Sequence, residues 1–113
     1  MNQFISREDL KTLIASGKGH TLIEALPRNY YEAEHLPGAI NIPYDEVHAT
    51  ASRLITDKNS DIVVYCANSE CQDSHIAAET LRGLGYSCVY QYAEGKKGWK
   101  EAGLPLDIAG SAK

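Results

Sequence analysis

The sequence predicts an α/β fold in which a parallel sheet is covered by helices on both faces. Two observations predict it: short apolar or β-branched runs typical of strands, and amphipathic segments that separate them. The strand-like runs lie at residues 21–26, 38–43, 61–66 and 87–92. Strands that alternate with helices at this short spacing pair in parallel and are buried between helical layers.

The bulk composition fits a small globular protein. A chain of 113 residues suits one domain, so we expect a single domain over residues 1–113, with a core at about 4–107 and a frayed tail at 108–113. The net charge of −4 argues against nucleic-acid binding. No stretch approaches the roughly 18 apolar residues that a membrane span needs, and the N-terminus lacks signal-peptide features. We therefore expect a cytoplasmic protein with neither nucleic acid nor membrane as a partner.

The first half of the chain contains clear helix and strand signals. Ser6 and Asp9 form a capping-box pattern before a first helix, and Gly17 is a natural stop for it. A second helix over residues 45–54 has apolar residues at helical spacing behind Asp45, which we expect to be its cap. The β-branched run at residues 61–66 is typical of a strand at the centre of the sheet.

The second half continues the alternation. Residues 74–84 carry an apolar helical stripe, and Gly85 supplies the C-terminal stop. Residues 87–92 alternate as a strand does, with Cys88 expected in the packing. A last helix carries Trp99 as a core residue and ends near Gly103.

Cys66 is the strongest candidate for chemistry. It ends the predicted central strand and precedes a polar loop and a helix, so backbone amides of residues 67–74 and the helix N-terminus are expected to cradle an anionic sulfur. Glu70 and Asp73 oppose this, and they disfavour dianionic substrates if they face the cradle. Asp73, Ser74, or a capping box of Ser69 with Gln72 compete to start the following helix.

Four motifs in order resemble the rhodanese homology domain. They are "LIEALPRNYYEAEHLPGAINIP" with Glu24 on the family's Asp, "VVYC" ending at the catalytic cysteine position, "AA…L…GY" behind it, and "GKKGWKEAGLPL" at the close. The resemblance covers residues 21–106 and extends to a subset with EALP and a Cys-x4-Cys loop. It implies a five-stranded parallel sheet, and it places the sulfur-carrying role on Cys66.

The chain departs from the family pattern at two arginines. The Arg that follows the family's first strand is absent, and Arg28 is a candidate to replace it partly. In the longer loop, Asp73 falls where the family has Arg. Cysteine phosphatases resemble Cys-x5-Arg, and the matching position is Gln72, so phosphatase chemistry is disfavoured. His35, in the HIPGA-like motif, is expected to make a structural hydrogen bond, with a catalytic part as the alternative.

Cys71 allows two interpretations. It is either a resolving or protective thiol that forms a disulfide with Cys66, or a small residue that fills the base of the loop. The candidate catalytic residues are Cys66 and Cys71. The candidate substrate-binding residues are Ala67, Asn68, Ser69, Glu70, Gln72, Asp73 and Ser74, with Arg28 and His35. Lys96 and Lys97 are expected on a solvated face, and His75 is a solvated side chain.

The leading function is a sulfurtransferase that carries sulfane sulfur as a persulfide on Cys66. The alternatives are a thiol redox module that cycles a Cys66–Cys71 disulfide, and a binding domain that has lost turnover. The expected partners are a small sulfane-sulfur donor and a thiol or cyanide-type acceptor, and a protein acceptor stays open. No cofactor is expected. No metal site is expected either, because the three cysteines and four histidines show no paired ligand spacing.

Overall fold

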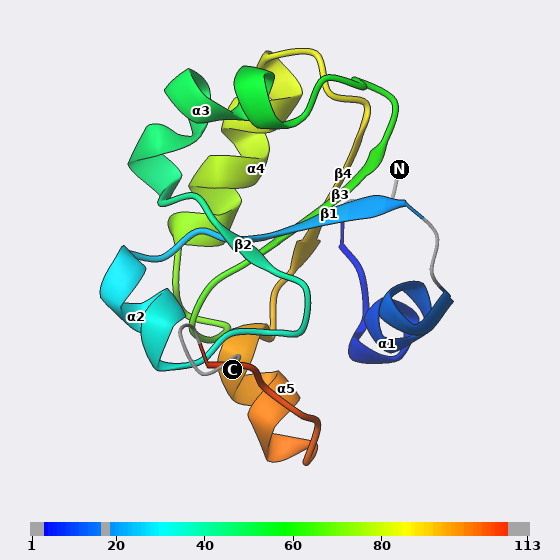
Figure 1. The fold of residues 1–113 in the computed structure, drawn as a ribbon, viewed down its shortest axis with the longest axis vertical. Helices are drawn as coiled ribbons and strands as arrows, with labels where there is room; N and C mark the ends of the chain where they lie inside the picture. Colours follow the sequence, from blue (N-terminus) through cyan, green and yellow to red (C-terminus); the bar gives the residue numbers. More distant parts are fainter. Residues whose placement is uncertain (1–3, 17–18, 109–113) are drawn as a thin grey trace.

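The computed structural model describes residues 4–16 and 19–108, which form an alternating series of helices and strands (Figure 1). In order along the chain these are α1 (Arg7–Ser16), β1 (His20–Glu24), α2 (Arg28–Ala33), β2 (Ile40–Asn41), the 3-10 turn η1 (Tyr44–Glu46), α3 (Val47–Leu54), β3 (Asp61–Tyr65), α4 (Asp73–Gly83), β4 (Cys88–Tyr92) and α5 (Gly95–Glu101). The expected helix stop at Gly17 and the end of the expected tail, residues 109–113, lie outside the described residues. No helix of the described part is long and apolar enough to cross a membrane.

The sheet is parallel throughout, with the strand order β2-β1-β3-β4. A fifth position is taken by Phe4, which forms an isolated parallel bridge with Gln91, and the Ile5 amide donates to the Gln91 carbonyl at 3.1 Å. The described residues therefore contain four strands and one single-residue bridge where five strands were expected. Ser6, two residues after this bridge, caps α1, which begins at Arg7, so the pairing does not extend further toward α1.

Helices cover both faces of the sheet, as predicted (Figure 1). One core contains Ile23 and Val64 from the strands with buried residues of α3 and α4. The other contains Val63 with Leu10 of α1 and Trp99 of α5. Adjacent Val63 and Val64 thus face opposite layers, because side chains alternate along a strand.

The order of connections places a crevice between β1 and β3. The chain passes from β1 to β2 on one side and from β3 to β4 on the other, so the direction of winding reverses between these two strands. Ligands of open α/β sheets bind beyond the carboxyl ends of the strands at such a reversal. Both Leu26, after β1, and Ala67, after β3, line a hollow of about 300 Å³ there.

The helix signals were partly right. The Asp9 amide donates to the Ser6 hydroxyl at 3.0 Å, which confirms the predicted cap of α1. The predicted cap at Asp45 is wrong, because Asp45 lies inside η1 and α3 begins at Val47 without a side-chain cap. Gly85 follows α4 with a φ of 101°, a left-handed conformation that suits glycine and ends the helix.

Candidate active site

Cys66 lies at the carboxyl end of β3, beside the reversal point of the sheet, as the sequence predicts. Cys66 is buried, with 1% of its surface exposed. The thiol donates to the Cys71 carbonyl at 3.5 Å and to the Ser74 hydroxyl oxygen at 3.4 Å. The Cys71 carbonyl can only accept, whereas the Ser74 hydroxyl can accept from the thiol or donate to the sulfur.

The surroundings of the thiol favour its protonated form. Burial is the largest cause, and with the Cys71 side chain it raises the pKa of the Cys66 thiol from 9.0 to about 11. Hydrogen bonds from the Ser74 hydroxyl and the Ser74 backbone amide act in the opposite direction and lower the pKa. In this conformation Cys66 is a buried thiol at neutral pH, and Ser74 is the group that favours its anion.

Two amides of the expected cradle, those of Glu70 and Cys71, are engaged within the loop instead of facing the sulfur, so the prediction is wrong for these two residues. The Glu70 amide donates to the Asn68 side-chain oxygen at 3.0 Å, and the Cys71 amide donates to the Asn68 carbonyl at 3.2 Å. The longer loop closes on itself as a turn, so these amides serve the turn instead of the sulfur.

The start of α4 also differs from each expected cap. The helix begins at Asp73 after Gln72, and the structure shows no side-chain capping bond there. Ser74 is turned inward, 1% exposed, with its hydroxyl oxygen between the thiol and the Gln91 side-chain amide, which donates to it at 3.1 Å. Asp73 is half-buried, and burial followed by the nearby Asp45 raises the pKa of its carboxyl group.

The beginning of α5 fixes the first residues of the loop. The amides of Lys96 and Lys97 donate to the carbonyls of Cys66 and Ala67, each at 2.8 Å. Gly95 has a φ of 68°, and a Cβ built on it would lie 2.6 Å from the Cys66 carbonyl oxygen. The close approach of the two backbones therefore requires glycine at this position.

A buried ion pair lies next to this contact. The Lys96 ammonium donates to the Glu24 carboxylate at 2.9 Å and to the carbonyls of Tyr30 and Glu34 at 2.9 and 2.6 Å. Tyr65 donates to the other Glu24 oxygen at 2.8 Å. Glu24 is 0% and Lys96 8% exposed, so the expected solvated face is wrong for Lys96; Lys97 is exposed, as expected.

Two of the predicted site residues lie elsewhere. Arg28 pairs with Glu32 at 2.8 Å, and its side chain is 76% exposed. It lines a separate hollow beyond α2 with Pro43, so the structure does not bring it to the Cys66 loop. His35 is buried, stacks on the Tyr31 ring at 3.9 Å and bonds the Tyr31 carbonyl through Nδ1, which is the expected structural bond.

The remaining residues singled out in the sequence have structural contacts. Trp99 is buried and donates to the Pro105 carbonyl at 2.8 Å, which confirms it as a core residue. Cys88 begins β4 and is half-buried, so it is less enclosed than expected. Across the described residues, no three His, Cys, Asp or Glu side chains gather into a metal site.

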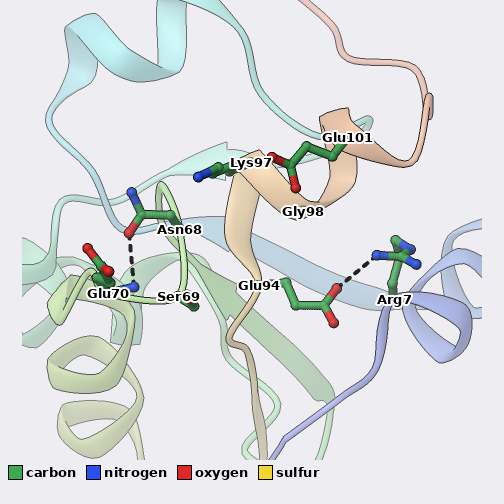
Figure 2. Close-up of a pocket in the computed structure, with 8 residues that line it drawn as sticks. All are labelled: Arg7, Asn68, Ser69, Glu70, Glu94, Lys97, Gly98 and Glu101. Atoms are coloured by element: carbon green, nitrogen blue, oxygen red, sulfur yellow. Dashed lines mark hydrogen bonds and ion pairs between the residues drawn. The ribbon is translucent and has the colours of Figure 1, made fainter.

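The exposed side of the loop borders a hollow of about 380 Å³ (Figure 2). Asn68, Ser69 and Glu70 of the loop lie opposite Lys97, Gly98 and Glu101 of α5. Arg7 and Glu94 lie at one side and are joined by an ion pair at 3.2 Å (Figure 2). The charges at this hollow are mixed, and the Cys66 thiol is buried behind the loop instead of lining it.

Comparisons with known proteins agree with this architecture. The family profile of the rhodanese-like domain matches residues 6–102. The HTH-type transcriptional regulator Rv0324 of Mycobacterium tuberculosis is 38% identical over 87 residues, 77% of this chain and 37% of that protein. The thiosulfate sulfurtransferase PspE of Escherichia coli is 37% identical over 75 residues, 66% of each chain.

A solved structure shows the same likeness in three dimensions. The human single-domain sulfurtransferase TSTD1 superposes with a TM-score of 0.77 at 26% identity, covering 89% of this chain and 97% of the other. The parallel sheet covered by helices, with a cysteine at the end of its central strand, defines the class of this protein as an α/β domain with a candidate cysteine site. This chain belongs to the rhodanese-like domain family, whose named members include sulfurtransferases. It spans less than half the length of the first curated relatives that it matches.

Proposed function

We propose that this protein is a sulfurtransferase that carries sulfane sulfur as a persulfide on Cys66. The observation that supports this most is the position of Cys66, at the end of the central strand with its thiol against Ser74 and the Cys71 side chain. Family membership supports the same chemistry, since relatives are named sulfurtransferases.

The reaction needs two displacements at sulfur. In the first, the Cys66 thiolate attacks the outer sulfur of the donor, the donor's S–S bond breaks, and its electron pair leaves with the donor thiolate. In the second, an acceptor thiolate attacks the outer sulfur of the Cys66 persulfide and regenerates the Cys66 thiolate. No net oxidation occurs, because each displacement forms one bond to sulfur and breaks another.

Cys71 acts as a resolving thiol in this proposal. Its thiolate would attack the Sγ of the Cys66 persulfide, release hydrosulfide and leave a Cys66–Cys71 disulfide, which an external dithiol or two thiols must reduce. Three free cysteines suit a reducing compartment, so the cytoplasm is part of the proposal.

The charges near the loop bear on the donor. No arginine lies in the loop, and the Lys96 ammonium is already held by Glu24. Asp73 and Glu70 add negative charge instead. A small organic persulfide is therefore favoured over the dianion thiosulfate, with a small thiol or a protein thiol as acceptor.

A redox module is the second candidate, because the Cys71 side chain lies close enough to affect Cys66. Here Cys66 and Cys71 would cycle between two thiols and a disulfide, with hydrogen peroxide as the oxidant. Titration of free thiols, after the sulfur donor and then after hydrogen peroxide alone, separates the two candidates. A sulfur carrier gains one sulfur from the donor, whereas a redox module loses both thiols to peroxide and gains no sulfur.

The test is mass spectrometry of the intact protein after incubation with glutathione persulfide. Wild type should gain one sulfur atom, Cys66→Ser should gain none, and Cys71→Ser should gain sulfur but release it more slowly. Cys88→Ser is the matched control and should behave as wild type. Sulfur gain by Cys66→Ser equal to that of wild type would show the proposal to be wrong.

A further inference from the structure

Gln91 is a buried polar side chain near the carboxyl end of β4 that the sulfur-transfer steps above do not use. It is 8% exposed, and its side-chain amide donates to the Ser74 hydroxyl oxygen at 3.1 Å. The Cys66 thiol donates to the same oxygen at 3.4 Å. The Ser74 oxygen thus has two buried neighbours that can donate a hydrogen bond to it, the Cys66 thiol and the Gln91 amide.

A hydroxyl group has one proton and two lone pairs, which limits what Ser74 can do. While the protonated thiol donates its single proton to Ser74 instead of to the Cys71 carbonyl, both lone pairs are occupied, by Cys66 and Gln91. When the thiol loses its proton, the lone pair that faced it is released, and the hydroxyl can turn its own proton toward the sulfur. Gln91 has no titratable proton and donates in both states, which strengthens the hydroxyl as a donor.

We propose that Gln91 is a positioning residue for sulfur transfer, because it orients the Ser74 hydroxyl to donate to the anionic sulfur on Cys66. The anion is the thiolate before loading, or the outer sulfur of the persulfide after it. This inference rests on the proposed function, and it assigns to β4 a part in chemistry that otherwise lies on β3 and α4.

The other groups around the sulfur do not replace this donor. From the loop, the Cys71 carbonyl is an acceptor and repels an anion, and the Cys71 side chain raises the thiol pKa. From α5, Lys96 contributes a backbone bond to the Cys66 carbonyl, and its ammonium is bound to Glu24. Within residues 4–16 and 19–108, the donors recorded toward the sulfur are the hydroxyl and the amide of Ser74.

The backbone of Gln91 is held independently of its side chain. It pairs with Val64 in the β3–β4 ladder, and its carbonyl accepts from the Ile5 amide. A change of side chain is therefore expected to leave the strand in place. Gln91→Met keeps a similar volume and removes the donor, whereas Gln91→Glu replaces the donor by a carboxylate that accepts the Ser74 proton.

The test measures the rate of iodoacetamide alkylation of Cys66 against pH, in the full chain without any sulfur donor, by peptide mass spectrometry. Gln91→Met should raise the midpoint of this profile by about one pH unit, and Gln91→Glu should raise it further. Tyr90→Phe, a neighbouring change on the same strand, should leave it unchanged. Sulfur transfer from glutathione persulfide should lose kcat in Gln91→Met while KM stays the same.

A cycle with Ser74 separates positioning from packing. Ser74→Ala should raise the midpoint, and adding Gln91→Met to it should cause no further shift. A Gln91→Met midpoint equal to wild type, or a full additional shift in the double variant, would overturn the proposal. If Gln91→Met does not fold, Gln91→Asn, whose amide is too short to reach Ser74, takes its place. Sulfur loading of wild type tests the proposed function separately, since alkylation needs no donor.

Discussion

Lys96 contacts three parts of the molecule: the Cys66 loop, the end of β1 and the end of α2. Its backbone amide holds the Cys66 carbonyl, and its ammonium binds the Glu24 carboxylate and two carbonyls at the end of α2. An ion pair this deeply buried contributes little net stability when intact, because desolvation offsets the attraction between the charges. Removing one partner is different, since the other charge stays buried alone.

Lys96→Met is therefore expected to lower the free energy of unfolding by about 3–5 kcal/mol, measured by urea denaturation. Lys100→Met is the matched control: its ammonium pairs with Glu34 on the surface, and its loss should cost less than about 1 kcal/mol. Adding Glu24→Gln to Lys96→Met should restore a large share of the lost stability. Equal effects of the two lysine changes would contradict the account of the buried pair.

This network also shows what a sequence pattern leaves undetermined. Lys96 and Lys97 are adjacent in a polar segment, which is typical of a solvent-facing helix, and the partner of Lys96 is 72 residues away. Gln91 did carry a signal. Gln91 lies two residues after Val89, so the two side chains are on the same face of the predicted strand. The sequence therefore shows a polar side chain at a position where an apolar core residue is expected.

At the scale of elements, the contact between the Cys66 loop and the start of α5 depends on Gly95. Both Gly95 and Gly103 have positive φ values, 68° and 77°. A Cβ at Gly95 would lie 2.6 Å from the Cys66 carbonyl oxygen and 2.8 Å from the Asn68 amide nitrogen, whereas a Cβ at Gly103 meets nothing within 4 Å. A side chain at Gly103 would therefore meet only backbone strain, whereas a side chain at Gly95 would meet strain and a steric clash.

Gly103→Ala should cost about 1 kcal/mol of unfolding free energy, for the left-handed backbone alone. Gly95→Ala should cost at least about 2 kcal/mol more, because backbone atoms on both sides must move. It should also change the alkylation rate of Cys66, whereas Gly103→Ala should not. Thermal or urea unfolding measures the loss of unfolding free energy in each variant. Equal losses would mean that the Cys66 loop moves to accept the new Cβ at no cost, which would contradict the predicted clash.

The elements themselves were more predictable than their ends. The β-branched run of β3 and the alternation of β4 appear where the sequence indicated them, because burial between helices selects such residues. The loop after Cys66 was less predictable. Several polar residues there could cap the helix, and the turn closed by Asn68 took up amides expected to face the sulfur. Competition among neighbouring polar groups is decided by packing, which local patterns do not record.

For the whole molecule, buried acids set the response to alkaline pH. Burial raises the pKa of Cys66 to about 11 and that of Tyr92 to about 12, and it raises the pKa of Tyr65 as well. Each group binds its proton more tightly in the folded state than in the unfolded chain. The unfolding free energy therefore falls as pH rises above the ordinary thiol pKa of 9.0 toward 11 and beyond.

Urea denaturation at a series of pH values checks this expectation. Wild type should keep a constant stability from neutral pH to about 8.5 and lose it steadily above that. Cys66→Ala should lose less between pH 9 and 11, since it lacks the thiol that titrates there. A wild-type stability that stays flat to pH 11 would contradict the burial of the thiol.

The position of β3 has a consequence for any sulfur attached to its end. All five of its residues are paired on both sides, to β1 and to β4, whereas β2 at the edge has two pairs. Fraying begins at such edges, and the amide protons of a doubly bordered strand exchange with solvent only when the entire fold opens. A persulfide on Cys66, as proposed above, would therefore lie at the end of the strand that opens last, and local unfolding at the edge of the sheet would leave its surroundings in place.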